Sequence, residues 1–458
     1  MAAAIWATAL TISACDESPV QPLVDNSCGD VVTFESGKTP SRIQHVSVGG
    51  NDVTGDGTMA RPFRTMARAA RDVSPGTAIY LHGGPHAGGM FLDGVRGTAE
   101  QPIWIMGAPD EPRPVIQGGG DGLHLVKPRY VVVQNLEIRQ TAANGINVDD
   151  GDEVADSDAA RFLVFRDLDI HDTGQQPAGI ADCLKLAGVY DFFVFRSVFS
   201  HCGLNPISGA VGVGGVGVHR GLVASNRFTA NGYGGAQFKG GSDDIRVTGN
   251  FFQETGWRAV NMGGRTGEQF FRPPLSPVAM NYEAARVSVQ ANIFVGSETA
   301  AAFTGCVDCD FSHNTVVDPS KWTIRILQES VTTARYAFAP ASRGRIADNI
   351  FYFRRSDLDA GEDINVGPAT DSHSFALLTN LWYAHDSPRQ SQPRLKLFEG
   401  QHTGSIVGIN PDFANRAAAD FHLTRRSIAE GAGDRAWAPR RDFAGRCYLD
   451  SPSLGALQ

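Results

Sequence analysis

The chain has 458 residues, 42% of them apolar and 19% charged, and its formal net charge is −9. No run of Lys or Arg occurs, so a surface for nucleic acid or an anionic membrane has no electrostatic support, and an acidic ligand would need a local basic groove or a bridging cation. The 26 Phe residues are enough to fill a core, and 52 Gly residues suit tight turns between short strands better than helices.

Residues 2–14 are apolar and small, and they run into Ile12-Ser13-Ala14-Cys15. This segment resembles the lipobox of bacterial lipoproteins, in which the cysteine is lipidated after cleavage. No Lys or Arg precedes it, so an apolar N-terminus with an ordinary cysteine remains the alternative. We expect a signal segment over 1–15 and a polar, Pro-containing tether over 16–45. The protein would then be exported, as a cell-surface or periplasmic lipoprotein or in secreted form.

Residues 58–73 are predicted to form a helix. Thr58 lies near its start and Pro62 in its first turn. Apolar residues follow at helical spacing, namely Phe63, Met66, Ala67, Ala70 and Val73. Because a solenoid needs its open end covered, we expect this helix to close the N-terminal end.

One pattern recurs nine times: a polar residue, then Asn or a small substitute, then alternating apolar residues. The anchor positions are Asn135, Asp167, Ser197, Asn226, Asn250, Asn292, Asn314, Asn349 and Asn380. The shortest interval is 22 residues (292 to 314) and the longest is 42 (250 to 292). Asn tolerates the left-handed conformation, so it suits a sharp turn at the same place in every coil. Stacked units bury one continuous core, which predicts an all-β parallel β-helix over 46–458.

Both ends of this repeat region carry further motifs. Val46-Ser47-Val48-Gly49-Gly50-Asn51-Asp52 is followed by Arg61-Pro62-Phe63, Pro75-Gly76-Thr77 precedes Gly83-Gly84, and the chain closes with Ser453-Leu454-Gly455-Ala456. These segments resemble the opening and closing parts of pectate-lyase-like β-helix proteins. The resemblance covers nearly the whole chain and implies a single-stranded right-handed parallel β-helix. It says little about reaction, because this fold hosts lyases, hydrolases, epimerases and adhesins.

Without Cys15, six cysteines remain, and an even number in an exported chain permits disulfides. We expect Cys183 and Cys202 to be joined, because they lie at the same general level of successive coils. Cys306 and Cys309 have the spacing of a zinc or redox motif, but no second such pair occurs, so a structural role is favoured.

Residues eleven positions after four Asn anchors are predicted to form one outward column. They are Gln237, Asn261, Phe303 and Arg325. At about 4.8 Å per coil the column spans roughly 14 Å, comparable to a few sugar units. We expect these four residues and Arg265 to bind substrate, with Phe303 as a platform on which a sugar ring stacks. If the strand register is shifted by one residue there, Phe303 lies in the core instead. Lys239 lies two residues after Gln237 in the same predicted strand, so its side chain is expected to point outward as well.

Charged residues surround the glycine pairs 240–241 and 263–264, where a ligand can approach the backbone. The longest insertion, which contains residues 265–283, would form a wall beside the column. Abstracting the proton next to a uronic carboxylate requires that this carboxylate be neutralised, by Ca²⁺ or Arg, and a Lys or Arg base. Polysaccharide lyases of this fold work in this way. The resemblance therefore implies Lys239 or Lys185 as the base, with Arg258 and Arg325 near the carboxylate. Calcium is the candidate cofactor, with Asp182, Asp243, Asp244 and Glu268 as candidate ligands.

The leading function is thus a polysaccharide lyase that cleaves a uronic-acid polymer by β-elimination. A glycoside hydrolase needs two carboxylates on one face, which Asp243, Asp244 and Glu268 would supply. A non-catalytic carbohydrate-binding or adhesive β-helix is the third possibility. In each case we expect the partner to be an extended, acidic polysaccharide. We expect a monomer that touches a membrane only through a lipid anchor.

Overall fold

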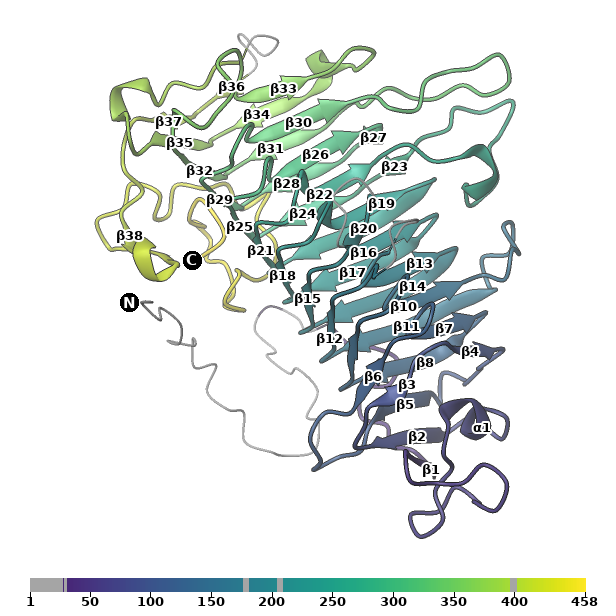
Figure 1. The fold of residues 1–458 in the computed structure, drawn as a ribbon. Helices are drawn as coiled ribbons and strands as arrows, with labels where there is room; N and C mark the ends of the chain where they lie inside the picture. The colour runs from purple at the N-terminus through teal and green to yellow at the C-terminus, as the bar shows by residue number, and fades with distance from the viewer. Residues whose placement is uncertain (1–27, 29–30, 176–180, 204–208, 396–401) are drawn as a thin grey trace.

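The computed structural model describes residues 28, 31–175, 181–203, 209–395 and 402–458. Short strands wind into a right-handed parallel β-helix whose coils stack along one axis (Figure 1). Most coils contribute one strand to each of three long sheets, which we name A, B and C, and the chain passes from B to A to C. The single-stranded parallel β-helix predicted from the repeats is confirmed.

Sheet A contains β1 (Arg42–Ser47), β2 (Thr77–His82), β5 (Ile103–Gly107), β8 (Arg129–Gln134), β11 (Ala160–Arg166), β14 (Val189–Phe195), β17 (His219–Ala224), β20 (Ser242–Thr248), β23 (Ala284–Ala285), β24 (Ser288–Gln290), β27 (Cys306–Val307), β28 (Asp310–Ser312), β31 (Arg345–Ala347), β34 (Ala376–Leu378) and β36 (His402–Thr403). Sheet B contains β4 (Met90–Asp93), β7 (Leu123–Val126), β10 (Ile146–Asp149), β13 (Leu184–Ala187), β16 (Val211–Val216), β19 (Gly234–Lys239), β22 (Arg258–Gly263), β26 (Ala301–Thr304), β30 (Ile324–Leu327) and β33 (Ile364–Val366).

Sheet C contains β3 (His86–Ala87), β6 (Val115–Gln117), β9 (Glu137–Arg139), β12 (Asp169–His171), β15 (Val198–Ser200), β18 (Arg227–Thr229), β21 (Phe251–Gln253), β25 (Ile293–Val295), β29 (Thr315–Val317), β32 (Ile350–Phe353), β35 (Leu381–Ala384) and β37 (Ile406–Val407). β38 (Phe413–Asn415) and β39 (Asp420–Leu423) form a separate antiparallel pair. The helical elements are α1 (Met66–Ala70) and the short 3₁₀ turns η2 (Glu268–Phe270), η3 (Ser372–Ser374), η4 (Pro388–Gln390) and η5 (Arg416–Ala418).

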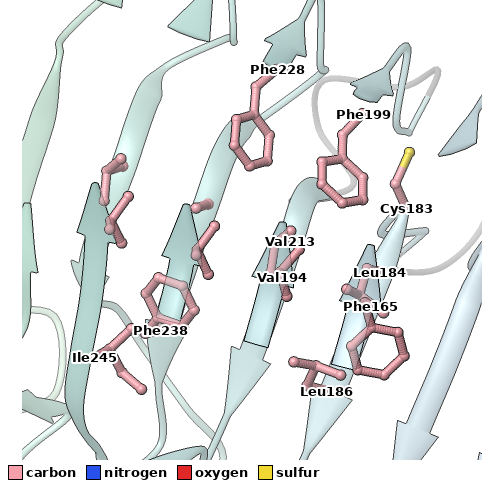
Figure 2. Close-up of a cluster of buried hydrophobic side chains, with 14 of the residues drawn as sticks. Phe165, Cys183, Leu184, Leu186, Val194, Phe199, Val213, Phe228, Phe238 and Ile245 are labelled. Atoms are coloured by element: carbon pink, nitrogen blue, oxygen red, sulfur yellow. The ribbon is translucent and has the colours of Figure 1, made fainter. Parts of the chain in front are cut away.

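Large side chains fill the core in register. Phe199, Phe228, Phe252 and Phe294 occupy the middle position of consecutive sheet C strands, and their neighbouring rings stack with centroids 4.6–5.1 Å apart. The spacing of coils, about 4.8 Å, matches the stacking distance of aromatic rings, so the same residue fits every coil. Figure 2 shows Phe199 and Phe228 pointing into this core with Val194, Val213 and Phe238.

A ladder of buried Asn side chains follows the corner between sheets A and C. Its members are Asn226, Asn250, Asn292, Asn314, Asn349 and Asn380, and each Nδ2 donates to the next Oδ1 at 2.9–3.1 Å. Each of these Oδ1 atoms also accepts from the backbone N–H of the preceding Asn in the ladder. Because an amide donates and accepts at once, the ladder satisfies polar groups of a turn that is buried in the core.

The left-handed position of this turn is the residue before the ladder, not the Asn itself. Ser225, Gly249 and Ala291 have positive φ values there, so the conformational role predicted for the Asn is wrong. Asn135 and Asp167 also have positive φ and therefore lie one residue ahead of the ladder. The pattern nevertheless located the turn in each coil.

The N-terminal helix is shorter than predicted. α1 begins after Thr65, whose side chain accepts from the Arg68 N–H, whereas Thr58 pairs with Arg61 in a β-bridge. Met66 and Ala69 belong to the main core, and α1 packs against β1, β2 and β4. Its role as a cover for the end of the solenoid stays a prediction.

The segment expected to be a tether lies partly against the solenoid. Phe34 packs on an apolar row along the outer face of sheet A, and buried Glu35 accepts from Arg166 Nη1 at 3.0 Å. Cys28 is joined to Cys447 by a disulfide, and β1 begins inside the expected tether. Residues 1–27, including the signal segment and the Cys15 lipidation site, lie outside the described residues. Within the described ranges, no helix is long and apolar enough to cross a bilayer.

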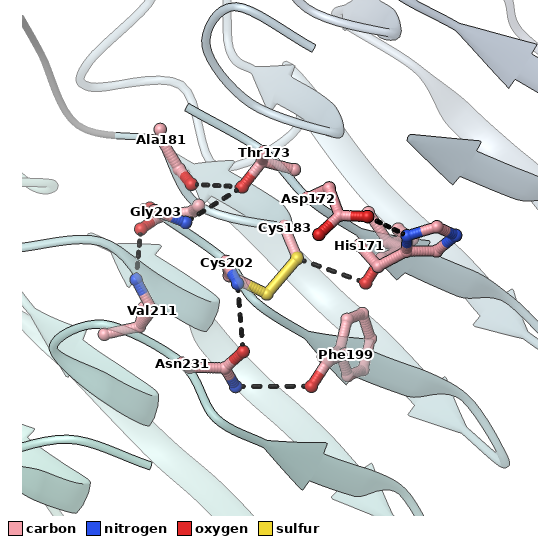
Figure 3. Close-up of a disulfide and its surroundings, with 12 residues drawn as sticks. His171, Asp172, Thr173, Ala181, Cys183, Phe199, Cys202, Gly203, Val211 and Asn231 are labelled. Carbon is pink, nitrogen blue, oxygen red and sulfur yellow. Dashed lines mark hydrogen bonds and ion pairs between the residues drawn. A yellow bond between two sulfur atoms is a disulfide. The ribbon is translucent and has the colours of Figure 1, made fainter. Parts of the chain in front are cut away.

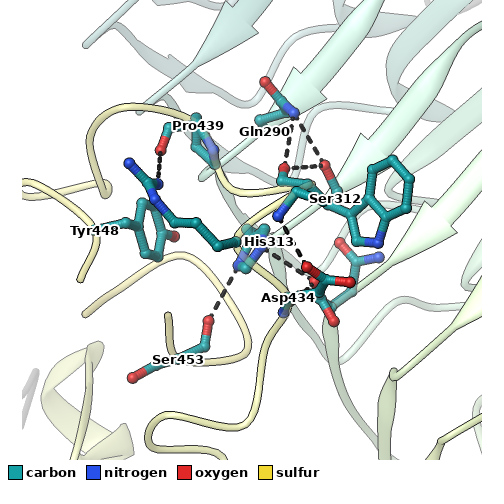
Figure 4. Close-up of polar contacts among 12 residues, drawn as sticks. Gln290, Ser312, His313, Asp434, Pro439, Tyr448 and Ser453 are labelled. Atoms are coloured by element: carbon teal, nitrogen blue, oxygen red, sulfur yellow. Dashed lines mark hydrogen bonds and ion pairs between the residues drawn. The ribbon is translucent and has the colours of Figure 1, made fainter. Parts of the chain in front are cut away.

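The last fifty residues fold back over the outer face of sheet C instead of adding coils, which corrects the predicted extent of the β-helix. Leu454 and Ala456 are fully buried in a second apolar cluster with residues of β29, β32 and β35. Figure 4 shows this contact around His313, whose Nδ1 lies 3.0 Å from the Ser453 carbonyl oxygen and whose ring faces Tyr448. The segments at the two chain ends therefore cover parts of sheets A and C.

Cys183 and Cys202 are joined by a disulfide between successive coils, with their Cα atoms 5.3 Å apart (Figure 3). Cys306 and Cys309 form another, which favours the structural reading of that motif over zinc or redox chemistry. We expect mass mapping of the unreduced protein to recover the peptides of Cys183 and Cys202 cross-linked. Free thiols at both positions in protein freshly purified without reductant would contradict this pairing.

Candidate functional site

One row of outward positions runs the length of sheet B in unbroken register, and we call it the B row. It comprises Phe91, His124, Asn147, Lys185, Gly214, Gln237, Asn261, Ala302, Arg325 and Asn365. With about 4.8 Å between coils, these ten positions span roughly 43 Å. Most of them are polar. Both ends of the row are exposed or half-buried, whereas Gly214, Gln237, Asn261 and Ala302 in its middle are buried. Polar groups repeated at about the length of a sugar residue suit an extended polymer.

The B row contains three of the four residues predicted for the column, but Phe303 is not among them. Ala302 takes its place, while Phe303 is fully buried in the core and pairs with Ile326. The stretch after Asn292 is one residue shorter than the corresponding stretches, so the offset there is ten rather than eleven. The stacking role proposed for Phe303 is therefore wrong, and the alternative core placement is correct.

Arg258 and Asn261 form a polar cluster in the middle of sheet B. Arg258 is 6% exposed, donates from Nη2 to Glu329 Oε1 at 2.7 Å and approaches Thr304 Oγ1 at 3.5 Å. The Thr304 hydroxyl donates to Asn261 Oδ1 at 2.7 Å. Arg258 Nε and Asn261 Nδ2 are buried donors without a partner among the residues that the structure describes. Because buried donors are normally satisfied, the cluster has unused capacity for acceptor oxygens.

Arg325 and Tyr233 border this cluster. Arg325 Nε donates to Asn365 Oδ1 at 2.9 Å, and its guanidinium lies 4.3 Å from the centre of the Trp322 ring. Burial, and then the positive charge of Arg258, lower the pKa of Arg325. Burial raises the pKa of Tyr233, although Arg258 opposes this, so Tyr233 keeps its proton at neutral pH. Buried Arg258 and half-buried Arg325 thus bring two positive charges together beside the B row, one of them paired with Glu329.

Two glycines, Gly263 and Gly264, lie between Lys239 and the Arg258 cluster, and we call them the glycine strip. Lys239 Nζ donates to the carbonyl oxygen of exposed Arg265 at 3.4 Å, and Gln237 Nε2 donates to Gly263 O at 3.1 Å. Gly263 and Gly264 have φ values of +103° and +152°, and a Cβ on Gly264 would lie 2.8 Å from Gln237 Nε2. Only glycine fits there, because the Thr304 carbonyl, Gln237 and Lys239 pack directly against this backbone, and both glycines are buried.

Asp182 lies beside Gly214 of the B row. Its buried carboxylate accepts from Val211 N at 2.8 Å, and a Cβ on Gly214 would lie 2.2 Å from its Oδ2. Burial raises the pKa of Asp182 to about 6, while the charges of Lys185 and Lys239 oppose the rise. Asp182 therefore lies within electrostatic range of two lysines at the N-terminal side of the glycine strip.

This placement predicts a specific pH dependence of stability. The pKa of Asp182 is about 6 in the fold against 3.8 for an ordinary Asp, so the native state binds more protons in that window. The free energy of unfolding should therefore fall as pH rises from about 4 to about 6, by an amount on the order of 3 kcal/mol. Asp182→Asn should remove this fall, which urea unfolding of both proteins across the window would measure. Parallel curves for the two proteins would rule out the raised pKa.

The four carboxylates predicted as calcium ligands do not converge. Asp243 and Asp244 lie on β20 in sheet A, because the glycine pair before them turns the chain out of sheet B. Asp243 bonds to His219 Nδ1 at 2.6 Å, Asp244 pairs with Arg286 at 2.7 Å, and Glu268 is exposed on the insertion. Across the described ranges, no group of three His, Cys, Asp or Glu side chains can hold a metal ion. The predicted ligand set is therefore wrong, as is the hydrolase pair drawn from Asp243, Asp244 and Glu268.

The insertion between β22 and β23 stands beside the B row and is held firmly. Buried Glu283 accepts from Gly240 N at 2.9 Å, and from Thr266 N and Oγ1 at 2.9 and 2.7 Å. Arg272 donates to both carboxylate oxygens of buried Asp150 at 2.7 and 2.9 Å. The insertion thus spans the coils from β10 to β22 as a fixed wall.

An open pocket of about 460 Å³ lies away from the B row, lined by residues that include Tyr282, Arg286 and Arg343. Arg286 and Arg343 are each paired with a neighbouring aspartate, and no residue of the B row lines this pocket. The chemical groups suited to a reaction are concentrated instead along sheet B, between Asp182 and Arg325. Sequence reasoning missed Tyr233, Thr304 and Glu329, because the first and last lie beyond strand ends, where the offset rule does not reach.

No protein-family model matches the chain, and no curated protein sequence matches it. Among solved structures, the pectate lyase Pel9A is 14% identical with a TM-score of 0.51, and the match covers 92% of this chain and 97% of that protein. XylC, solved in complex with xylose, is 12% identical with a TM-score of 0.55, covering 90% of this chain and 98% of that protein. At such identities the likeness shows the fold.

Proposed function

We propose, from the pectate-lyase-like β-helix fold of this chain, that it is a carbohydrate-active protein that binds an extended acidic polysaccharide along the B row and cleaves it by β-elimination. The observation that carries the proposal is the Arg258 cluster, where buried Arg258 and half-buried Arg325 lie with two buried donors that have no partner among the described residues. A uronic carboxylate would supply acceptor oxygens to these donors and a countercharge to Arg325, whereas Arg258 is already paired with Glu329.

In the proposed reaction, Arg258 and Asn261 bind the uronic carboxylate and stabilise the charge that develops on it. Lys239, on the other side of the glycine strip, takes the proton from the carbon next to that carboxylate. The electron pair of this C–H bond forms a carbon–carbon double bond, and the bond to the leaving sugar oxygen breaks. That oxygen takes a proton from water, and Lys239 returns its proton to the solvent, so cleavage yields one unsaturated and one reducing end. Lys185, beside Asp182, is the second candidate for the base.

A panel of uronic polysaccharides tests the reaction, with ultraviolet absorbance of the unsaturated end and reducing sugar measured in parallel. Both signals should rise together. Reducing sugar without absorbance would indicate hydrolysis. Binding without either product would indicate a carbohydrate-binding β-helix.

Arg325→Ala should chiefly weaken substrate binding. A hydrogen bond to a charged group contributes about 1.5–3 kcal/mol, so we expect KM to rise roughly ten- to a hundredfold with kcat nearly unchanged. Arg426→Ala, at an exposed arginine in the C-terminal segment, is the control and should leave KM unaltered. A fall in kcat with KM unchanged would assign Arg325 to the chemical step instead.

A further inference from the structure

The B row continues toward the N-terminus beyond Lys185, and its first positions form a second cluster. Phe91, His124 and Asn147 lie on the adjacent strands β4, β7 and β10 (Figure 1). The Phe91 side chain is 60% exposed, and its ring meets His124 edge-on, with centroids 5.1 Å apart. With Asp121 and Asp149 these residues make up what we call the N-terminal patch.

Hydrogen bonds fix the polar groups of the N-terminal patch. His124 Nε2 lies 2.5 Å from Asp149 Oδ2, and Asn147 Nδ2 donates to Asp121 Oδ2 at 3.1 Å. The Asp121 carboxylate also accepts from the backbone and side-chain amides of Asn144. An exposed aromatic ring beside fixed carboxylate and amide groups can bind the apolar face of a sugar ring and its hydroxyls together.

The charge of the N-terminal patch is opposite to that of the Arg258 cluster. Asp121 and Asp149 are accompanied by exposed Asp93 at the end of β4, and His124 is the one basic side chain among the patch residues. A uronic carboxylate placed here would face carboxylates at close range, which disfavours it by like-charge repulsion. Neutral sugars carry no such penalty, and their hydroxyls donate to carboxylates.

We propose that the N-terminal patch is a binding subsite for neutral sugar residues, so that the substrate is a mixed polysaccharide of neutral and uronic residues and not a uronic homopolymer. Phe91 and Asn261 are six coils apart in the B row, a distance of roughly 29 Å at about 4.8 Å per coil. One chain of several sugars reaches from the Arg258 cluster to Phe91. This inference rests on the proposed binding of a polysaccharide along sheet B.

Calorimetric titration of the Lys239→Met variant, which should bind without turnover, tests the inference. The ligands are mixed oligosaccharides long enough to reach Phe91, short uronic oligosaccharides, long uronic homopolymers and neutral oligosaccharides. Adding Phe91→Ala should weaken binding of the long mixed ligands roughly tenfold, as expected for the loss of one aromatic contact. Binding of the short uronic ligands should stay unchanged. Because Phe91 is exposed, its removal should leave the unfolding transition where it is.

Asp149→Asn, introduced into the Lys239→Met variant, gives a second test. The expected changes in affinity for uronic and for neutral ligands have opposite signs. Removal of this carboxylate should strengthen binding of the long uronic homopolymer by relieving repulsion, and weaken binding of neutral oligosaccharides. Equal dependence of mixed and uronic ligands on Phe91 would overturn the neutral-sugar assignment. Neutral oligosaccharides could bind in a Phe91-dependent manner while no uronic ligand binds. That result would support the neutral-sugar subsite and contradict the proposed lyase function. If no sugar depends on Phe91, the subsite does not exist.

Discussion

Lys239→Met is expected to lower kcat by a factor of about 10² to 10⁴ while leaving the affinity for the polysaccharide nearly unchanged. Methionine keeps the length and apolar stem of lysine but cannot accept a proton. Lys239 makes one long hydrogen bond, to a backbone carbonyl, so its removal disturbs little of the wall beside it. Turnover is measured as the absorbance of unsaturated ends, and affinity by titration of the same variant.

Lys127→Met is the matched control, because Lys127 follows β7 at the edge of sheet B and lies outside the B row. It should retain full activity. Activity of Lys239→Met comparable to that of the unmodified protein would remove Lys239 from the reaction, and Lys185→Met would then become the variant to measure.

Arg272→Met should lower the free energy of unfolding by about 3–5 kcal/mol, the usual result of breaking a buried ion pair on one side. The side chains of Arg272 and Asp150 are 6% and 2% exposed, so the substitution leaves the Asp150 carboxylate buried without its countercharge. A Cβ on Gly188 would lie 2.2 Å from Asp150 Oδ2, so little space remains for solvent to reach this carboxylate. Urea unfolding measures the change.

Two further variants isolate the buried charge. Arg265→Met, on the exposed part of the same insertion, should change stability by less than about 0.5 kcal/mol. Arg272→Met combined with Asp150→Asn should recover part of the loss, since no uncompensated charge remains. Equal destabilisation by the single and the double variant would show that packing of the arginine, and not its charge, holds the insertion.

The repeat could be recognised in the sequence because successive coils have the same buried turn at the corner between sheets A and C. A buried turn needs a side chain that donates and accepts, so Asn recurs from Asn226 to Asn380 and marks each coil. In the first coils the ladder position is occupied by Leu136 and Leu168. There the sequence pattern selected the polar residue one position earlier. The sheet to which a residue belongs could not be predicted in the same way. The glycine pair before Asp243 and Asp244 ends the sheet B strand, so both residues lie in sheet A.

The site was predictable only where strand parity sets the direction of a side chain. Gln237, Asn261 and Arg325 followed from parity, whereas Phe303 was displaced by a one-residue deletion that leaves no mark in the sequence. Glu329 lies beyond the end of β30 and joins the site because the long side chain of Arg258 reaches it. Contacts of that kind depend on reach across coils and require coordinates.

The disulfide between Cys28 and Cys447 changes how such a solenoid can come apart. A stack of similar coils is a one-dimensional assembly, in which each coil is held only by its neighbours and unravelling starts most easily at an end. Here the cross-link joins two cysteines that are 419 residues apart in the sequence. It fixes the N-terminal segment on sheet A to the C-terminal segment on sheet C. Peeling of the terminal segments is then opposed by a covalent bond as well as by apolar packing. This closure would keep partly unwound coils from exposing their strand edges to other chains.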